Sequence, residues 1–179
     1  AYIRIDRKLG EWMNMLGEDT IIIVASDHGA KRMDGGICIN EWLWKNGYLA
    51  FIQDPPSGTL TRLQDLDIDW EKTTAWGSGG YYGRVFLNIK NREPQGTIDP
   101  SDTERVQREL ADRIARIPDD QGQPLDTEVS LPEDRYHTVS GVAPDLMIYF
   151  GDLHWRSVGT LGHGSFTTLE NDTGPDDCN

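Results

Sequence analysis

The sequence predicts an α/β fold in which helices flank a mainly parallel sheet. Residues 21–25 form an uninterrupted run of β-branched and apolar side chains, which is typical of a strand buried on both faces of a parallel sheet. Residues 144–150 contain a second such run. Helical and strand patterns alternate in the first third of the chain, and this order favours parallel neighbours in one sheet.

The first third of the chain contains four predicted elements. Residues 2–16 are predicted to form an amphipathic helix, because their apolar side chains recur on one stripe. The strand of residues 21–25 follows. Residues 39–46 are predicted to form a second helix, and Gly47 stands where a helix C-terminal glycine belongs. Residues 48–52 are a candidate for a short strand.

The rest of the chain is less regular but has recognisable elements. Residues 84–89 have the pattern of a strand. A capping box at residues 101–104 opens a helix that ends near Pro118. Residues 124–131 are a further strand candidate, and residues 144–150 are the second buried strand.

Composition limits what kind of protein this is. The chain has 179 residues, 37% hydrophobic residues and six tryptophans, which suits one globular core. The net charge of −13 argues against binding to nucleic acid or to an anionic membrane. No run approaches the roughly 18 apolar residues that span a bilayer. The two cysteines, Cys38 and Cys178, favour a reducing, cytoplasmic compartment.

Three residues suggest a metal site. Asp27 and His28 follow directly after the predicted strand of residues 21–25, and chemistry in such sheets lies just beyond the carboxyl ends of the strands. A carboxylate and an imidazole suit a divalent metal, and Gly29 lets the backbone turn. His163, between two glycines, is a third candidate ligand. The alternatives are a helix-capping Asp27, a surface His28 and a His163 hydrogen-bonded within a turn.

Other chemistry-bearing residues favour structural roles. His137 and His154 have ordinary polar or aromatic neighbours, as surface or structural histidines do. Residues 77–80 are rich in glycine, but without a Walker lysine they indicate a tight turn rather than a phosphate cradle. Arg84 beside them is interpreted as a strand residue rather than a phosphate ligand. The three aspartates of residues 172–177 lack an EF-hand register and indicate a solvated loop.

Three stretches, in this order, carry a resemblance to a known family. They are residues 24–29 (Val-Ala-Ser-Asp-His-Gly), residues 76–90, and Gly162-His-Gly164 together with residues 170–177. Together they resemble the type I phosphodiesterase/nucleotide pyrophosphatase branch of the alkaline phosphatase superfamily, and within it the bacterial predicted phosphohydrolase/phosphomutase group. The resemblance runs through nearly the whole chain and matches the carboxyl-terminal portion of a longer family member.

The resemblance implies a doubly wound α/β fold with two divalent metal ions, probably zinc or else manganese, between the strand ends. Asp27 and His28 would be ligands of the metal that also holds the nucleophile, and His163 a ligand of the companion metal. The nucleophilic threonine or serine and the remaining ligands are expected upstream. Residues 1–179 are therefore interpreted as the carboxyl-terminal part of a single catalytic domain, which by itself would bind metal weakly and be inactive.

The function that this resemblance implies is metal-dependent hydrolysis of phosphodiester or nucleotide pyrophosphate bonds through a covalent enzyme intermediate. The expected partner is a phosphate-ester small molecule or nucleotide. Two alternatives stay open: a phosphomutase of the same superfamily, and a noncatalytic binding module on the same scaffold. Self-association is a further expectation, through surfaces that truncation would expose.

Overall fold

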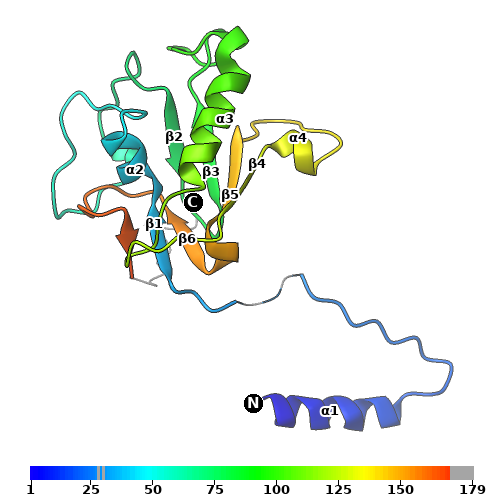
Figure 1. Cartoon of the computed structure of the whole chain (residues 1–179). Coiled ribbons are helices and arrows are strands. Elements are labelled where there is room, and N and C mark those ends of the chain that lie inside the picture. Colours follow the sequence, from blue (N-terminus) through cyan, green and yellow to red (C-terminus); the bar gives the residue numbers. More distant parts are fainter. Residues whose placement is uncertain (28, 30, 170–179) are drawn as a thin grey trace. The chain divides into compact units, whose positions relative to one another are not determined.

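The computed structural model describes residues 1–27, 29 and 31–169, which belong to two compact units. The first unit, Ala1–Ala30, contains the helix α1, Tyr2–Met15. The second unit, Lys31–Asn179, contains every strand of the described part of the chain (Figure 1). Both helices and strands are present, so the α/β class is confirmed, while the doubly wound arrangement stays a prediction.

The first unit confirms one sequence prediction and corrects another. Helix α1 matches the helix predicted for residues 2–16. The strand predicted for residues 21–25 is wrong: these residues form no ladder, and the Val24 side chain is 94% exposed. A strand exists only through hydrogen bonds to a neighbour, and the described part of this unit offers none, since its other element is a helix.

The first sheet of the second unit has three strands in the order β6-β1-β7. Strand β1 is Gly35–Cys38, β6 is Trp155–Val158 and β7 is Thr167–Thr168. Strands β1 and β6 pair in parallel, and β7 pairs antiparallel on the other side of β1. Every residue of β1 and β6 is buried, so this pair forms an inner part of the unit.

The second sheet has four strands in the order β2-β3-β5-β4, and every pairing in it is antiparallel. The strands are β2, Ala75–Ser78; β3, Gly83–Leu87; β4, Glu128–Ser130; and β5, Leu146–Tyr149. Strands β4 and β5 fall within predicted strands, and β3 overlaps the strand predicted for residues 84–89 but begins one residue earlier. The expected mainly parallel pairing is not found in the described sheets, where only β1 and β6 are parallel. Strands β2 and β3 are joined by a four-residue turn, which can connect only antiparallel strands.

The helices largely follow the sequence prediction. Helix α2, Ile39–Lys45, ends as expected at Gly47, whose φ of +78° is readily adopted by glycine. Helix α3 is Thr103–Ile114 and the single-turn α4 is Pro132–Arg135. Three 3₁₀ segments complete the fold: Leu63–Asp65, Pro100–Asp102 and Phe150–Leu153.

Two local predictions fail at element boundaries. The capping box expected at residues 101–104 is absent, because the chain enters α3 through the 3₁₀ turn Pro100–Asp102 and no side chain caps the helix. The strand candidate at residues 48–52 is reduced to one bridge between Phe51 and Ile68. The strand candidate lacks a neighbouring segment along which a ladder could continue. The helix begins one residue later than the box requires, with Asp102 instead of Ser101 at the N-cap position.

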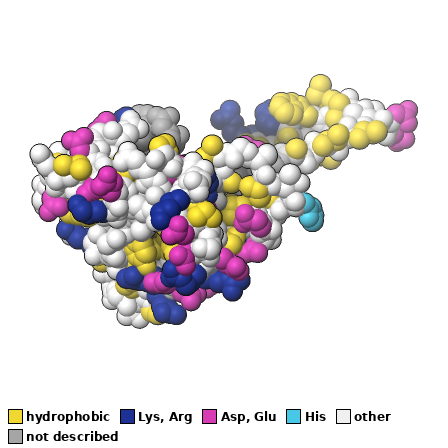
Figure 2. Space-filling view, turned by 90° about the horizontal axis from the view of Figure 1, so that it is seen from above, with side chains coloured by type: hydrophobic (Ala, Val, Ile, Leu, Met, Phe, Trp, Pro, Cys, Tyr) yellow, Lys and Arg dark blue, Asp and Glu magenta, His cyan; other side chains and the backbone are white. Residues whose placement is uncertain are grey.

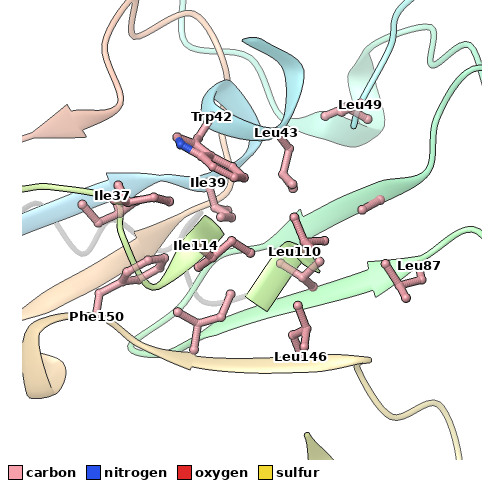
Figure 3. Packing of buried hydrophobic residues seen from close by; sticks show 14 of the residues in the cluster. Ile37, Ile39, Trp42, Leu43, Leu49, Leu87, Leu110, Ile114, Leu146 and Phe150 are labelled. Atoms are coloured by element: carbon pink, nitrogen blue, oxygen red, sulfur yellow. The ribbon is translucent and has the colours of Figure 1, made fainter. Parts of the chain in front are cut away.

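One hydrophobic core joins the elements of the second unit. Leu110 and Ile114 of α3 are fully buried and lie one helical turn apart, so they face the sheets together. They belong to one cluster with side chains from α2 and from both sheets (Figure 3). The labelled members are Ile37, Ile39, Trp42, Leu43, Leu49, Leu87, Leu110, Ile114, Leu146 and Phe150. Each fully buried side chain of this size contributes about 1.5–3 kcal/mol, so this cluster holds α2 and the strands in fixed positions.

The surface carries both signs of charge. Figure 2 shows Lys and Arg side chains interspersed with Asp and Glu on the face in view, which leaves no broad basic surface for a polyanion there. Among the described helices, none combines the length and the apolar character needed to cross a membrane.

Candidate functional site

His163 lies in the loop between β6 and β7, and the backbone on either side of it has a shape that favours glycine. Gly162 has a φ of +97° and Gly164 a φ of +66°, which is the left-handed region. A Cβ at Gly162 would lie 2.1 Å from the carbonyl oxygen of Thr59. Gly162 is therefore required where the loop approaches residues 58–61, and Gly164 is favoured by its left-handed backbone.

A buried carboxylate anchors this loop. Glu41, on α2, is 2% exposed, and its Oε1 accepts the backbone N–H of Gly162 at 2.7 Å and that of Gly164 at 3.3 Å. Residues 58–61 hold the loop as well. Thr61 and Leu161 exchange two backbone hydrogen bonds of 2.9 Å, and the N–H of Gly58 donates to the Gly162 carbonyl. The residues on both sides of His163 are thus held by the rest of the second unit.

Sequence reasoning did not single out Glu41, although a signal was present. A carboxylate inside the apolar run Ile-Asn-Glu-Trp-Leu stands where a core side chain would be expected, and a buried carboxylate needs hydrogen-bond donors. Asn40, the preceding residue, is also a polar side chain in this apolar run, and it is fully buried. Its side chain accepts the N–H of Gly77 and donates to the carbonyls of Gly77 and Gly159. Asn40 therefore ties β2 to the end of β6.

The Glu41 anchor gives a prediction for stability. Replacing Glu41 by leucine should lower the free energy of unfolding by about 1–3 kcal/mol, because the buried Gly162 N–H loses its acceptor. Glu41→Gln is the matched control, since its amide oxygen can still accept both bonds and the loss should be smaller. Urea denaturation of the three proteins tests this. Equal midpoints for Glu41→Leu and the parent would show that Glu41 does not anchor the loop.

The ring of His163 is oriented by a hydrogen bond. Its Nε2 lies 2.8 Å from Oγ1 of Thr160, and the side chain is half-buried. Histidines that ligate a metal are usually held in this way, by a hydrogen bond at one ring nitrogen. Together with the carboxylate and imidazole chemistry of the predicted set, this arrangement fits a divalent metal ligand.

The other two predicted ligands lie in the first unit. Asp27 is exposed, and its alternative role as a helix cap is wrong, because the next helix is α2 with Cys38 at its N-cap position. His28 lies outside the described residues. Asp27 and His163 belong to different units and are each described by themselves. Among the described residues, no three His, Cys, Asp or Glu side chains form a group that could hold a metal ion. Metal ligation by Asp27, His28 and His163 therefore stays a prediction.

A pocket of about 540 Å³ lies beside the His163 loop. Most of its lining residues are aromatic, apolar or small and uncharged. Thr160 is one of them, so the hydrogen bond between Thr160 and His163 joins the pocket wall to the histidine. The lining residues are Arg62, Leu63, Gln64, Ile68, Trp70, Trp76, Gly77, Ser78, Gly79, Ser157, Gly159 and Thr160. The segment that carries Ile68 and Trp70 is fixed by Asp69, whose pKa is held below its ordinary value by a hydrogen bond from Lys72.

The remaining polar candidates have structural roles. His154 Nδ1 donates to the carbonyl of Arg32 at 2.9 Å, as expected for a structural histidine. His137 is exposed. The guanidinium of Arg84 donates to Ser78 Oγ and to the Gly79 carbonyl, beside the β2–β3 turn. Of the tight turn predicted for residues 77–80, only Gly79 and Gly80 lie in that turn, because Gly77 and Ser78 belong to β2. Residues 172–177 lie outside the described part of the chain.

Comparison with known proteins identifies the family. The sequence profile of the family described as type I phosphodiesterase / nucleotide pyrophosphatase matches residues 1–176, which include Asp27, His28 and His163. No curated protein and no solved structure matches the chain. The match covers nearly every residue and confirms the resemblance carried by the three sequence stretches. The chain belongs to the type I phosphodiesterase / nucleotide pyrophosphatase family.

Proposed function

We propose that the intact protein hydrolyses phosphoric esters, either phosphodiester or nucleotide pyrophosphate bonds, with the help of two divalent metal ions. The family is one of hydrolases that act on phosphate-ester or nucleotide substrates. The observation that carries the proposal is the family match across residues 1–176, because it includes all three predicted metal ligands. In this proposal residues 1–179 are the carboxyl-terminal part of one doubly wound, alkaline-phosphatase-like catalytic domain.

Each predicted ligand has a chemical task. Asp27 would contribute an anionic oxygen and His28 an imidazole nitrogen to one metal, and His163 an imidazole nitrogen to the other. These donors suit zinc and also manganese. When bound, the two metal ions would lower the pKa of the nucleophile and stabilise charge on the attacking and leaving oxygens. Thr160 and Glu41 hold His163 in place: Thr160 bonds its ring, and Glu41 fixes the backbone on both sides of it.

The reaction would proceed in two displacements. A threonine or serine hydroxyl oxygen, expected outside residues 1–179, bonds to phosphorus as the bond to the leaving oxygen breaks, and a covalent enzyme intermediate forms. Water then attacks phosphorus, the bond to the enzyme breaks and the hydroxyl is regenerated. Because this nucleophile is expected elsewhere, the chain of residues 1–179 should show no turnover by itself.

Hydrolysis of bis-p-nitrophenyl phosphate by the full-length gene product tests the proposal. We expect turnover with zinc or manganese, loss of turnover on chelation and recovery when metal is restored. A folded, metal-loaded protein that releases no p-nitrophenol would contradict hydrolysis of this diester and favour a mutase or binding role. Turnover by residues 1–179 alone would instead contradict the placement of the nucleophile.

A further inference from the structure

The chain contains one dipeptide that is chemically prone to modification. Asn46 is the only asparagine in the sequence that is followed by glycine. In such a pair the backbone nitrogen of the glycine can attack the side-chain amide carbon of the asparagine, because glycine has no side chain to hinder the approach. Ammonia leaves and a cyclic succinimide forms. Water then opens the ring to give either aspartate or isoaspartate, whose backbone runs through the former side chain.

The fold holds the two reacting atoms apart. Asn46 is the C-cap residue of α2, and its ψ is 7°. At this angle the Gly47 nitrogen nearly eclipses the Asn46 nitrogen, whereas closure of the succinimide ring requires it to lie beside Cβ of Asn46. The Gly47 N–H also donates to the carbonyl of Trp44 at 3.0 Å, and the positive φ of Gly47 completes the helix end. Ring closure therefore requires this helix end to open first.

Both polar atoms of the Asn46 amide are held as well. Its Nδ2 donates to the carbonyl of Trp42 at 2.8 Å, and its Oδ1 accepts a hydrogen bond of 2.8 Å from the guanidinium of Arg113. Arg113 is on α3, so the second bond joins two helices through residues that are 67 positions apart in the sequence. The amide carbon that would be attacked is thus fixed from two sides.

Arg113 is itself held in place. Its Nη1 donates to the hydroxyl of Tyr48 at 2.8 Å, and its guanidinium carbon lies over the rings of Trp42 and Tyr48, at 5.7 and 5.1 Å from their centroids. These two rings stack on each other, with centroids 6.0 Å apart and an interplanar angle of 14°. A planar guanidinium can donate hydrogen bonds and lie on aromatic faces at the same time. Arg113 is therefore oriented to restrain the Asn46 amide.

We propose that Asn46 is a site of covalent modification, which deamidates through a succinimide with Gly47 and which Arg113 protects in the folded protein. The co-reactant is water. Deamidation would replace the Nδ2 donor by a carboxylate oxygen facing the Trp42 carbonyl, at a helix C-terminus that disfavours negative charge. Isoaspartate would also lengthen the backbone, so the C-cap geometry would be lost. The modification would therefore loosen the end of α2.

Peptide mapping that resolves the asparagine, aspartate and isoaspartate forms, after incubation of the full-length protein at mildly alkaline pH, measures this reaction. In urea, where the chain is unfolded, Asn46 should deamidate faster than Asn14, which is followed by the bulky Met15. In native buffer the rate at Asn46 should be at least about tenfold lower than in urea, because the helix end must open first. Arg113→Ala should raise the native rate about tenfold, since the hydrogen bond that it removes has a charged donor.

Two variants serve as controls. Arg116→Ala is matched to Arg113→Ala, because Arg116 is an exposed arginine just beyond the same helix and the Asn46 side chain bonds to Arg113 instead. It should keep the native rate within about twofold of the parent. Asp145→Ala removes a buried carboxylate that bonds to Leu87 and Arg92, so it lowers global stability away from Asn46. It should change the rate at Asn46 by less than about threefold, because local opening of a helix end does not require global unfolding.

Three outcomes would overturn the proposal, and the first two require no variant. Equal rates at Asn46 in native buffer and in urea would show that the fold does not protect it. A rate at Asn46 in urea no higher than that at Asn14 would exclude it as a preferred modification site. Equal native rates in Arg113→Ala and Arg116→Ala, or an equal acceleration in Asp145→Ala, would show that Arg113 is not the restraint.

Discussion

Replacing Asp27 by alanine should reduce metal-dependent hydrolysis of bis-p-nitrophenyl phosphate by the full-length protein more than about 100-fold. Removing a side chain that only orients a metal ligand already lowers metal affinity or activity by about 10–100-fold, so removing the ligand itself should exceed this range. His163→Ala should have an effect of the same order, because His163 is proposed to hold the companion metal. The measurement is kcat/KM at saturating zinc, with zinc content determined on the same samples.

Matched controls exist for both substitutions. Asp19 is an exposed carboxylate in the same unit as Asp27, and His137 is an exposed histidine in the same unit as His163. Asp19→Ala and His137→Ala should keep kcat/KM within about threefold of the parent, as surface substitutions usually do. If Asp27→Ala retained as much activity as Asp19→Ala, Asp27 could not be a metal ligand in the reaction.

The largest effect on stability is expected at Asp145. Its side chain is 7% exposed and accepts two hydrogen bonds of 2.7 Å from the guanidinium of Arg92, whose pKa it raises. It also accepts the backbone N–H of Leu87 at 2.6 Å. Asp145→Ala should lower the free energy of unfolding by about 1.5–3 kcal/mol, because the buried N–H of Leu87 loses a charged acceptor, whereas the guanidinium of Arg92, whose side chain is 42% exposed, can be solvated by water.

Urea denaturation of Asp145→Ala beside Asp99→Ala measures this effect. Asp99 also pairs with a cation, Lys90, but its side chain is 57% exposed, and an exposed pair contributes at most about 1 kcal/mol. The contrast between the two aspartates isolates the contribution of burial. Similar losses of stability in the two variants would argue against the buried Asp145 carboxylate as a principal tie between β3 and the entry to β5.

Local patterns in the sequence predicted the elements that depend on local interactions. Helix α2 with its terminal Gly47, helix α3 and the buried strand β5 were all visible as periodic runs or terminal residues. The apolar run at residues 21–25 has an equally clear strand pattern, but its ladder depends on another segment, and local periodicity carries no information about that segment. The same limit explains why the predicted parallel pairing is not found in the four-stranded sheet.

In the candidate site too, some residues were predicted from the sequence and others were not. His163 was predicted from its flanking glycines, and their positive φ values and close backbone approach explain those glycines. Glu41 was not predicted, since its partners are backbone amides 121 and 123 residues further along the chain. Trp70 and Trp76 were not predicted as a pair either. They lie in a stretch without periodicity, and only the fold brings both rings to one pocket.

The anchoring of the His163 loop has a consequence for how the second unit folds. The loop takes its shape from Glu41 and from residues 58–61, so a segment of roughly a hundred residues must be closed before those hydrogen bonds can form. Closing such a segment is entropically unfavourable until the core has brought its ends together. We therefore expect the amides of Gly162 and Gly164 to become protected from hydrogen exchange late in refolding, after those of α3.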